Sequence, residues 1–338
     1  MPTGGSAACG RRVSSGGVRS PWSPRIASWW VRSNASSARA SRIPIRAVAE
    51  PLLEERAAAK VNLDLHVLGR RGDGYHELDS LVVFGPAADR LLFTPAAELE
   101  LELAGPFAAE VPHGEANLVL RAARDLAAWT GTRRGAHILL EKNLPPAAGL
   151  GGGSADAAAT LRGLRRLWEL DLDLVQLLEL AASLGADVPV CLYGRTARIR
   201  GRGERIDPVR RLPALPLLLV NPGVELPTAA VFEALHGQAG EERRPPLPAG
   251  ASLPLFAAWL ERGRNDLEAA ARKLRPVIGE VLTRIREEPD CLVARMSGSG
   301  ASCWGLFARP AAAAAAAEHL AAAEPGWWVV HGTVESPP

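Results

Sequence analysis

The stretch Pro145-Pro-Ala-Ala-Gly-Leu-Gly-Gly-Gly-Ser-Ala-Asp-Ala-Ala-Ala159 places four glycines immediately before a helical pattern. Glycine has no Cβ, so its backbone can wrap closely around a bound group, and the N–H groups and positive dipole of a helix start attract an anion. The stretch therefore predicts a phosphate-binding loop. Taken alone, it is also compatible with a glycine-rich turn before an ordinary amphipathic helix.

Two common phosphate loops do not match this pattern. A Walker A loop has Lys and then Ser or Thr after its last glycine, whereas Ser154 and Ala155 follow Gly153. A dinucleotide fingerprint lies directly after a first strand and has Gly or Ala three residues after Gly151, where this chain has Ser154. Beyond the glycines, apolar residues recur every three or four positions, which predicts an amphipathic helix with Ser154 as its N-cap.

Length and composition limit the class of protein. The chain has 338 residues, 47% hydrophobic and 22% charged, which is typical of a globular protein with about two domains. A net charge of +2 is too small to indicate a nucleic-acid surface. The four cysteines form no C-x-x-C pair, and the apolar runs are much shorter than the roughly 20 residues that span a bilayer. We therefore expect no zinc site, and neither nucleic acid nor a membrane as a partner.

The first 49 residues differ in composition from the rest of the chain. They are rich in Ser, Arg and Gly and contain no Asp or Glu, so they cannot bury a core and we expect disorder. This composition is typical of an organelle transit peptide, which would place the protein in the plastid stroma. The equal alternative is an upstream stretch joined by a misassigned start, since no methionine lies between Met1 and Met296. In that case we expect the bacterial cytoplasm.

Residues 57–68 alternate apolar and polar side chains, which predicts a half-buried strand. Its polar face carries Lys60, Asn62, Asp64 and His66, and ordinary contact with solvent is an alternative reason for that face. Asp187 lies in a turn before Pro189, where capping of the local backbone is the simplest interpretation of an isolated aspartate. Further helices are expected at 117–129 and 174–184, and further strands at 77–84, 136–140, 195–205 and 217–220.

Considered together, the motifs of the chain resemble those of the GHMP kinase superfamily. They occur in the order Ala59-Lys-Val-Asn-Leu63, Gly72-Asp-Gly-Tyr-His-Glu77, Leu144 to Ala155, Leu184-Gly-Ala-Asp-Val-Pro189 and Met296-Ser-Gly-Ser-Gly-Ala301. The resemblance extends from about residue 56 to about residue 332. The triple glycine, the D-G-Y-H loop and the G-A-D-V-P turn are similar to the branch of the superfamily that acts on diphosphocytidyl-methylerythritol.

The resemblance implies an α+β fold with two domains and a site in the cleft between them. Residues 50–211 would form an ATP-binding domain similar to the second domain of ribosomal protein S5, and residues 212–338 a ferredoxin-like domain. The pattern of elements independently favours α+β, because strands and helices are mixed rather than strictly alternating.

The implied activity is ATP-dependent phosphorylation, with Mg²⁺, of the 2-hydroxyl of 4-diphosphocytidyl-2-C-methyl-D-erythritol. This reaction belongs to the non-mevalonate (methylerythritol phosphate) route to isopentenyl diphosphate and dimethylallyl diphosphate. One alternative is another GHMP kinase, acting on a mevalonate-type alcohol or homoserine, which we expect to lack the D-G-Y-H loop and the G-A-D-V-P turn. The other is a nucleotide-binding module without catalysis, which the presence of Lys60 and Asp187 disfavours. The implied partner is a small molecule, and the protein would be a monomer or a homodimer.

The resemblance also assigns roles to individual residues. Asp187 would be the general base and Lys60 would stabilise charge on the transferred group. Ser154 is the candidate contact for Mg²⁺, and Tyr75 and His76 would bind the cytosine ring. The residues implied for ATP are Pro145, Pro146, Ala147, Ala148, Gly149, Leu150, Gly151, Gly152, Gly153, Ser154 and Ala155. Those implied for the substrate are Asn62, Tyr75, His76, Asn117 and Lys142, with Gly298, Ser299 and Gly300 closing over the phosphate side.

Overall fold

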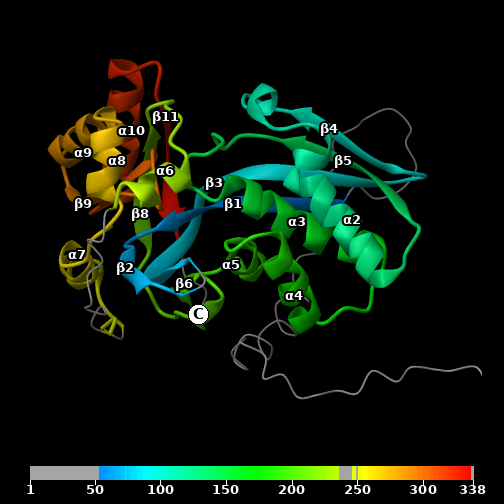
Figure 1. Ribbon diagram of the computed structural model, residues 1–338. Coiled ribbons are helices and arrows are strands. Elements are labelled where there is room, and N and C mark those ends of the chain that lie inside the picture. Colours follow the sequence, from blue (N-terminus) through cyan, green and yellow to red (C-terminus); the bar gives the residue numbers. More distant parts are fainter. Residues whose placement is uncertain (1–52, 73, 236–245, 249, 336–338) are drawn as a thin grey trace, which may run out of the picture.

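The computed structural model describes residues 53–72, 74–235, 246–248 and 250–335. It has an α+β fold with two β-sheets, each covered by helices (Figure 1). The tail at residues 1–49, for which we expected disorder, lies outside the described residues. No described helix has the length and hydropathy that crossing a membrane requires.

The first sheet is organised around one long central strand. Its strands are β1 (Leu53–Asn62), β2 (His66–Arg70), β3 (His76–Ala96), β4 (Leu99–Ala104), β5 (Gly135–Glu141), β6 (Ala197–Gly201) and β7 (Arg205–Pro208). The order is β4-β5-β3-β6-β7, and β1 and β2 also pair with β3. The strand predicted at 57–68 is therefore divided into β1 and β2, and the strand predicted at 195–205 becomes the β6–β7 hairpin. The strand predicted at 77–84 extends to 21 residues.

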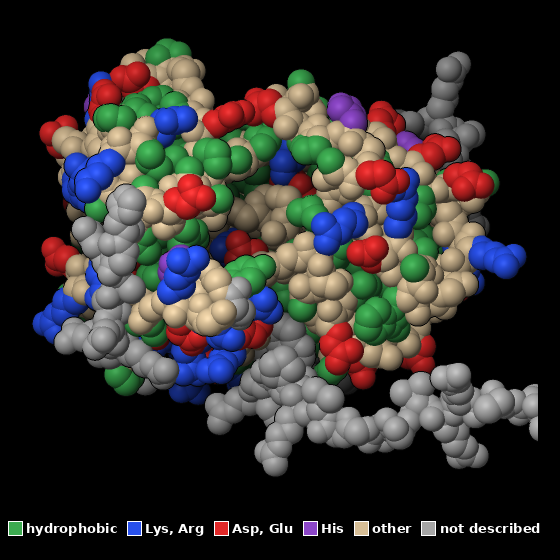
Figure 2. All heavy atoms as spheres, viewed as in Figure 1, with side chains coloured by type: hydrophobic (Ala, Val, Ile, Leu, Met, Phe, Trp, Pro, Cys, Tyr) green, Lys and Arg blue, Asp and Glu red, His purple; other side chains and the backbone are tan. Residues whose placement is uncertain are grey.

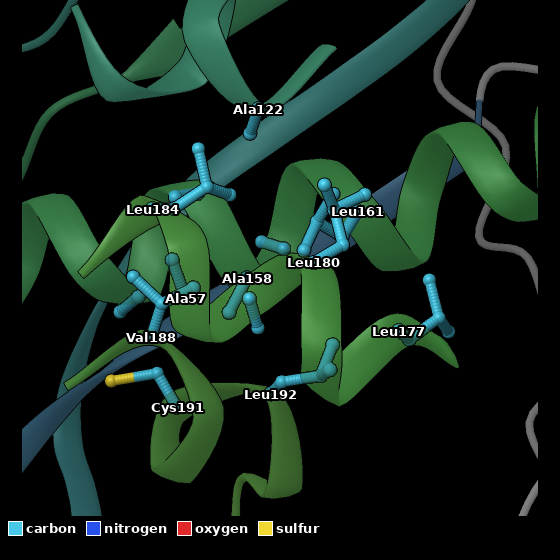
Figure 3. Close-up of a cluster of buried hydrophobic side chains, with 14 of the residues drawn as sticks. Ala57, Ala122, Ala158, Leu161, Leu177, Leu180, Leu184, Val188, Cys191 and Leu192 are labelled. Carbon is cyan, nitrogen blue, oxygen red and sulfur yellow. The ribbon is translucent and has the colours of Figure 1, made fainter. Parts of the chain in front are cut away.

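Four α-helices cover one face of this sheet (Figure 1). They are α2 (Leu118–Thr130), α3 (Gly152–Leu167), α4 (Leu174–Leu184) and α5 (Val188–Tyr193), and two short 3-10 turns, η1 (Ala108–Glu110) and η2 (Gly114–Ala116), precede α2. Leu161, Leu177 and Leu180 pack with Ala158 in the core beneath the helices (Figure 3). The predicted helix at 174–184 is confirmed, because a capping box begins it and Gly185 ends it.

The second sheet is antiparallel and has the order β11-β8-β10-β9. Its strands are β8 (Leu215–Asn221), β9 (Cys291–Met296), β10 (Cys303–Phe307) and β11 (Trp328–Val334). The helices of this half are α6 (Thr228–Glu233), α7 (Leu253–Glu261), α8 (Glu268–Leu274), α9 (Val277–Glu287) and α10 (Pro310–Ala323). The first sheet ends at Pro208 and the second begins at Leu215, so the boundary predicted between residues 211 and 212 lies in the connecting segment and stays a prediction.

The two sheets share a hydrophobic core. Side chains of β1 and β3, including Val61 and Val83, pack with side chains of β8 and β10, including Leu217 and Trp304. Hydrogen bonds join the same elements, since the Trp304 Nε1–H group donates to the Asn62 carbonyl oxygen over 2.9 Å. This shared core holds the end of β1 against the second half of the chain, which is where the polar residues of the candidate site lie.

Candidate active site

A cavity of about 300 Å³ lies where the two halves meet. It is lined by the end of β1, the glycine loop, the residue before α5, part of α6 and residues 298–299. Figure 2 shows a hollow in this face, between the side of α2 and α3 and the side of α6, α8 and α9. A larger groove of about 610 Å³ between α9 and α10 contains none of the predicted site residues.

Lys60 and Asp187 meet in this cavity, although they are 127 residues apart in the sequence. The Lys60 Nζ atom lies 2.9 Å from Asp187 Oδ2, with 6% of the lysine side chain and 39% of the aspartate side chain exposed. The register between β1 and β3 shifts between Ala58 and Lys60, and the Lys60 N–H group donates to the Leu150 carbonyl oxygen over 2.8 Å. The strand therefore attaches the lysine directly to the glycine loop.

Asp187 does not cap the local backbone. It occupies the residue before α5, but its side chain makes no capping hydrogen bond. The interpretation that an isolated aspartate in this turn serves as a cap is therefore wrong, and its carboxylate points to Lys60 instead.

Asn62 is fixed at the cavity wall by its neighbours. Its Nδ2–H group donates to Ser80 Oγ over 2.8 Å, and its backbone N–H group donates to Ser297 Oγ over 3.1 Å. The Oδ1 atom is buried and has no hydrogen-bond partner among the described residues. Because a buried amide oxygen is costly when it is unpaired, this atom is a plausible acceptor for a bound ligand's hydroxyl group.

The glycine loop lies backbone to backbone against the loop at 297–300. A Cβ on Gly149 would stand only 2.4 Å from the Ser297 carbonyl oxygen, and Gly149 has a φ of 72°. The Ser302 N–H group donates to the Ala148 carbonyl oxygen over 3.0 Å. Cavity-lining residues of the predicted ATP set are Ala147, Ala148, Gly149, Gly151, Gly152, Gly153 and Ser154, whereas Pro145, Pro146, Leu150 and Ala155 do not line it.

The helix after the glycine loop begins earlier than predicted. Gly151, in a left-handed conformation with a φ of 64°, is the N-cap of α3, so the prediction that Ser154 is the N-cap was wrong. Glycine is an accepted N-cap residue, so α3 starts with Gly152 and Gly153, and both line the cavity. Their N–H groups belong to the first turn of the helix, which has no acceptors of its own for them. Ser154 instead lies in the first turn and lines the cavity.

At the other end of the cavity, aromatic rings gather. The His76 ring stacks on Phe232 with 4.9 Å between ring centroids, and the guanidinium of Arg202 lies 4.9 Å from the centroid of Tyr75. Phe232 and Arg202 line the cavity, while 53% of Tyr75 is exposed beside it. Burial and then Arg70 lower the pKa of His76, so its ring is neutral near pH 7.

Of the five predicted substrate residues, only Asn62 lines the cavity itself. Tyr75 and His76 lie beside its wall, against Arg202 and Phe232, and the other two make contacts elsewhere. Asn117 is buried as the N-cap of α2, where its Oδ1 accepts from the Val119 N–H group over 2.9 Å. Lys142 is buried behind the loop, with its ammonium between Asp89 and Asp156. Gly300, from the predicted phosphate-side loop, is also outside the lining, whereas Gly298 and Ser299 are part of it.

Sequence reasoning missed several residues that line the cavity, namely Ser80, Arg202, Thr228 and Phe232. Ser80 lies two residues after Leu78 on β3, so the period of a strand puts both on the same face, and both line the cavity. Thr228 and Phe232 lie four residues apart, one turn of α6, but nothing in the sequence indicated that this turn faces the first domain. The hydroxyl of Thr228 lies 2.8 Å from that of Ser299.

No metal-binding group of three or more His, Cys, Asp or Glu side chains occurs in the described part of the chain. Mg²⁺ does not need such a group, because it commonly takes one or two protein oxygens together with phosphate oxygens and water. The Ser154 hydroxyl at the first turn of α3 is an oxygen of this kind, so the residues present fit a magnesium ion carried by a nucleotide.

Comparisons with known proteins identify the family of the chain. Residues 117–195 match the GHMP kinases N terminal domain and residues 251–325 match the GHMP kinases C terminal domain. The 4-diphosphocytidyl-2-C-methyl-D-erythritol kinase of Dinoroseobacter shibae is 53% identical over 279 residues, 81% of this chain and 92% of the relative. The protein of the same name from Parvibaculum lavamentivorans is 52% identical over 278 residues, 81% of this chain and 96% of the relative.

A solved structure leads to the same family. The crystal structure of a 4-(cytidine 5'-diphospho)-2C-methyl-D-erythritol kinase superposes with a TM-score of 0.69 and 41% sequence identity, covering 84% of this chain and all of that one. Kinases of this superfamily use ATP as the phosphate donor. The chain therefore belongs to the GHMP kinases and, within them, to the family of 4-diphosphocytidyl-2-C-methyl-D-erythritol kinases.

Proposed function

We propose that the protein transfers the γ-phosphoryl group of ATP to the 2-hydroxyl of 4-diphosphocytidyl-2-C-methyl-D-erythritol, in the non-mevalonate route to isopentenyl diphosphate and dimethylallyl diphosphate. The observation that carries the proposal is the Lys60–Asp187 pair, 2.9 Å apart in a cavity whose wall is the glycine loop. The relatives' names supply the substrate, and the geometry supplies a base and a cation beside a phosphate-binding helix start.

Asp187 would act as the general base. In the reaction, the substrate oxygen forms a bond to the γ-phosphorus, the bond from that phosphorus to the bridging oxygen of ADP breaks, and the hydroxyl proton passes to the Asp187 carboxylate. The Lys60 ammonium, 2.9 Å from this carboxylate, would hold it in position and offset negative charge on the transferred group. Asn62 Oδ1, unpaired beside them, would accept a hydrogen bond from the substrate and orient it.

The glycine loop would hold the phosphates of ATP by the N–H groups at the start of α3. In the first turn, the Ser154 hydroxyl would hold the Mg²⁺ that accompanies ATP, and this ion, when bound, neutralises charge on the β- and γ-phosphates. Gly298 and Ser299 line the cavity beside the loop and would cover the phosphate side.

The aromatic end of the cavity would bind the cytosine ring. Tyr75, His76 and Phe232 supply flat faces, and the neutral imidazole of His76 can both donate and accept a hydrogen bond. We do not assign Asn117 or Lys142 to the substrate, because both are buried in contacts away from the cavity.

We place the reaction in the bacterial cytoplasm, where ATP is abundant. The oligomeric state, monomer or homodimer, stays a prediction for light scattering to measure.

The discriminating experiment is a coupled ADP-release assay with three alcohols, each supplied with ATP and Mg²⁺. We expect turnover with 4-diphosphocytidyl-2-C-methyl-D-erythritol and none with mevalonate or homoserine. Phosphorus NMR of the product then distinguishes a 2-phosphate monoester from simple hydrolysis of ATP. Turnover of mevalonate or homoserine without turnover of the diphosphocytidyl alcohol contradicts the proposed substrate, and ATP binding without any turnover favours the non-catalytic alternative.

A further inference from the structure

Behind the glycine loop lies a buried ionic cluster that the proposed reaction does not use. It consists of Lys142, which follows β5, Asp89 on β3 and Asp156 on α3, each at most 4% exposed. The Lys142 Nζ atom contacts Asp89 Oδ2 and lies 2.7 Å from Asp156 Oδ2. Burial lowers the pKa of Lys142, but the two carboxylates outweigh burial and raise it above its usual value, so the ammonium stays charged.

Asp89 fixes the chain that enters the glycine loop. Its second oxygen, Oδ1, accepts from the Asn143 N–H group over 2.6 Å and from the Leu144 N–H group over 2.8 Å. The backbone of Lys142 is fixed as well, because its N–H group donates to the Ala104 carbonyl oxygen over 2.7 Å. The chain that enters the loop is therefore held from β3 through Asp89 and from β4 through Ala104.

Asp156 links the same point to the far side of the loop. It is the fifth residue of α3, so the Lys142–Asp156 contact joins the entry of the loop to the helix that ends it. Gly152 lies next to this cluster, because a Cβ at this residue would stand 3.1 Å from Lys142 Nζ and 3.7 Å from Asp89 Oδ2. The cluster is thus packed against the first residue of α3, whose N–H group belongs to the predicted phosphate site.

Stability alone is a weak reason for such a cluster. Buried ion pairs lose most of their Coulomb energy to desolvation, and well-packed apolar residues of similar volume often stabilise a protein equally or better. A buried charge cluster can instead select one arrangement of the elements that it joins, even though Asp156 Oδ1 has no hydrogen-bond partner among the described residues. Here the elements are the two ends of a loop that must present its N–H groups to an anion, with the Lys142 ammonium directly behind them.

We propose that Lys142, Asp89 and Asp156 are positioning residues that hold both ends of the glycine loop in the arrangement that binds nucleotide phosphates. The proposal rests on the proposed function in one respect, that the loop binds ATP. It makes Asp156 the connection on which the α3 end of the loop depends, and it explains why Lys142 is not available to the substrate.

The test measures ATP binding directly, by isothermal titration calorimetry of the full chain with ATP and Mg²⁺. Asp156→Ala cuts the connection while leaving Lys142 paired with Asp89, and we expect ATP affinity to fall by about tenfold because the loop is no longer held in register. Asp156→Asn keeps an oxygen in the same place and should restore affinity to within about twofold of the parent protein. In steady-state assays Asp156→Ala should raise KM for ATP more than it lowers kcat.

The matched control is Glu55→Ala, which removes the ion pairs of Glu55 with Arg162 and Arg166 farther along the same helix. This variant should change the melting temperature but leave ATP affinity unchanged. Equal losses of affinity in Asp156→Ala and Glu55→Ala, or unchanged affinity in Asp156→Ala, overturn the positioning role. If the protein binds ATP and the three variants differ as expected without turnover of the diphosphocytidyl alcohol, the proposed substrate fails and the positioning role stands.

Discussion

Lys60 has separate tasks for its backbone and its side chain. Its N–H group donates to the Leu150 carbonyl oxygen, while its ammonium pairs with Asp187. The stem of the side chain packs on Gly151, where a Cβ would stand 3.2 Å from the lysine Cε atom. One residue thus ties the central sheet to the phosphate loop and to the proposed base.

Replacing Asp187 with Asn should lower kcat by at least about 10²-fold, because an amide cannot accept the proton of the substrate hydroxyl. ATP binding should persist, since the glycine loop is untouched. Steady-state kinetics and calorimetry with ATP measure the two quantities, with Glu179→Gln on the exposed face of α4 as the carboxylate control. A kcat near that of the parent protein would remove Asp187 from the role of base.

Replacing Tyr75 with Ala should raise KM for the diphosphocytidyl substrate with little change in kcat. The lost stacking on a base is worth about 1–3 kcal/mol. Trp129→Ala is the control, because Trp129 is also about half exposed, at 50%, but lies on α2 rather than against the cavity-lining Arg202. An unchanged KM in Tyr75→Ala, or the same increase in Trp129→Ala, argues against cytosine binding at Tyr75.

At the scale of elements, the glycine loop and the loop at 297–300 form one unit although they come from different halves of the chain. The Ser297 hydroxyl donates to the Gly149 carbonyl oxygen over 3.0 Å, and a Cβ on Gly298 would stand 2.9 Å from that same oxygen. Glycine is required on both sides because the two backbones approach too closely for any side chain. The predicted phosphate site is therefore built by both halves of the chain.

Gly149→Ala tests this contact. The new methyl group would collide with the Ser297 carbonyl, so we expect a larger loss of unfolding free energy than the roughly 1–2 kcal/mol of left-handed strain alone, together with weaker ATP binding. Gly114→Ala is matched, because Gly114 has a similar φ of 64° but open space around its Cβ position. Urea unfolding compares the two variants, and equal losses in both would mean that backbone strain, rather than the contact between loops, explains the glycine.

At the scale of the whole molecule, β2 couples the first sheet to the second half of the chain. The Val67 N–H group donates to Asp266 Oδ2 over 2.7 Å, and the Leu65 N–H group donates to the Arg264 carbonyl oxygen over 2.9 Å. His66 lies between them, 3% exposed, with no hydrogen-bond partner for either ring nitrogen among the described residues. Polar residues on this face of the predicted strand are therefore buried between the two halves rather than solvated.

His66 should make stability depend on pH. Burial and then Arg264 lower its pKa, while Asp266 and Asp79 oppose them more weakly, so the folded pKa lies below the unfolded value near 6.5. Between these two values the unfolded chain binds a proton that the folded chain excludes. The free energy of unfolding should thus fall as pH drops below about 6.5.

Urea unfolding at several pH values between 7.5 and 5.5 measures this effect, with His66→Leu as the comparison. The variant should lose less stability on acidification than the parent protein, because it has no group to protonate at this place. Parallel pH profiles for the two proteins would show that other groups cause the acid sensitivity.

Much of this organisation could be predicted from local sequence. The periodicity of 174–184 and the glycine after it specify a helix and its end, and the order of the motifs specified the family. Local sequence patterns failed to predict the structure where it depends on contacts between two different elements. Ser154 has the chemistry of an N-cap, yet the left-handed Gly151 begins the helix, and the alternation of 57–68 gave no sign that β1 ends at Asn62.

By itself the sequence determined the α+β class, because side-chain periodicity is a property of the chain itself. It also predicted a phosphate-binding loop from its glycines, and the motif resemblance singled out Lys60 and Asp187. Only the tertiary structure decided that these two residues meet 2.9 Å apart, that Phe232 joins the aromatic end of the cavity, and that Lys142 lies behind the loop between Asp89 and Asp156. The reason is physical. A contact across 127 residues depends on how two sheets pack around a shared core, and no local pattern records that packing.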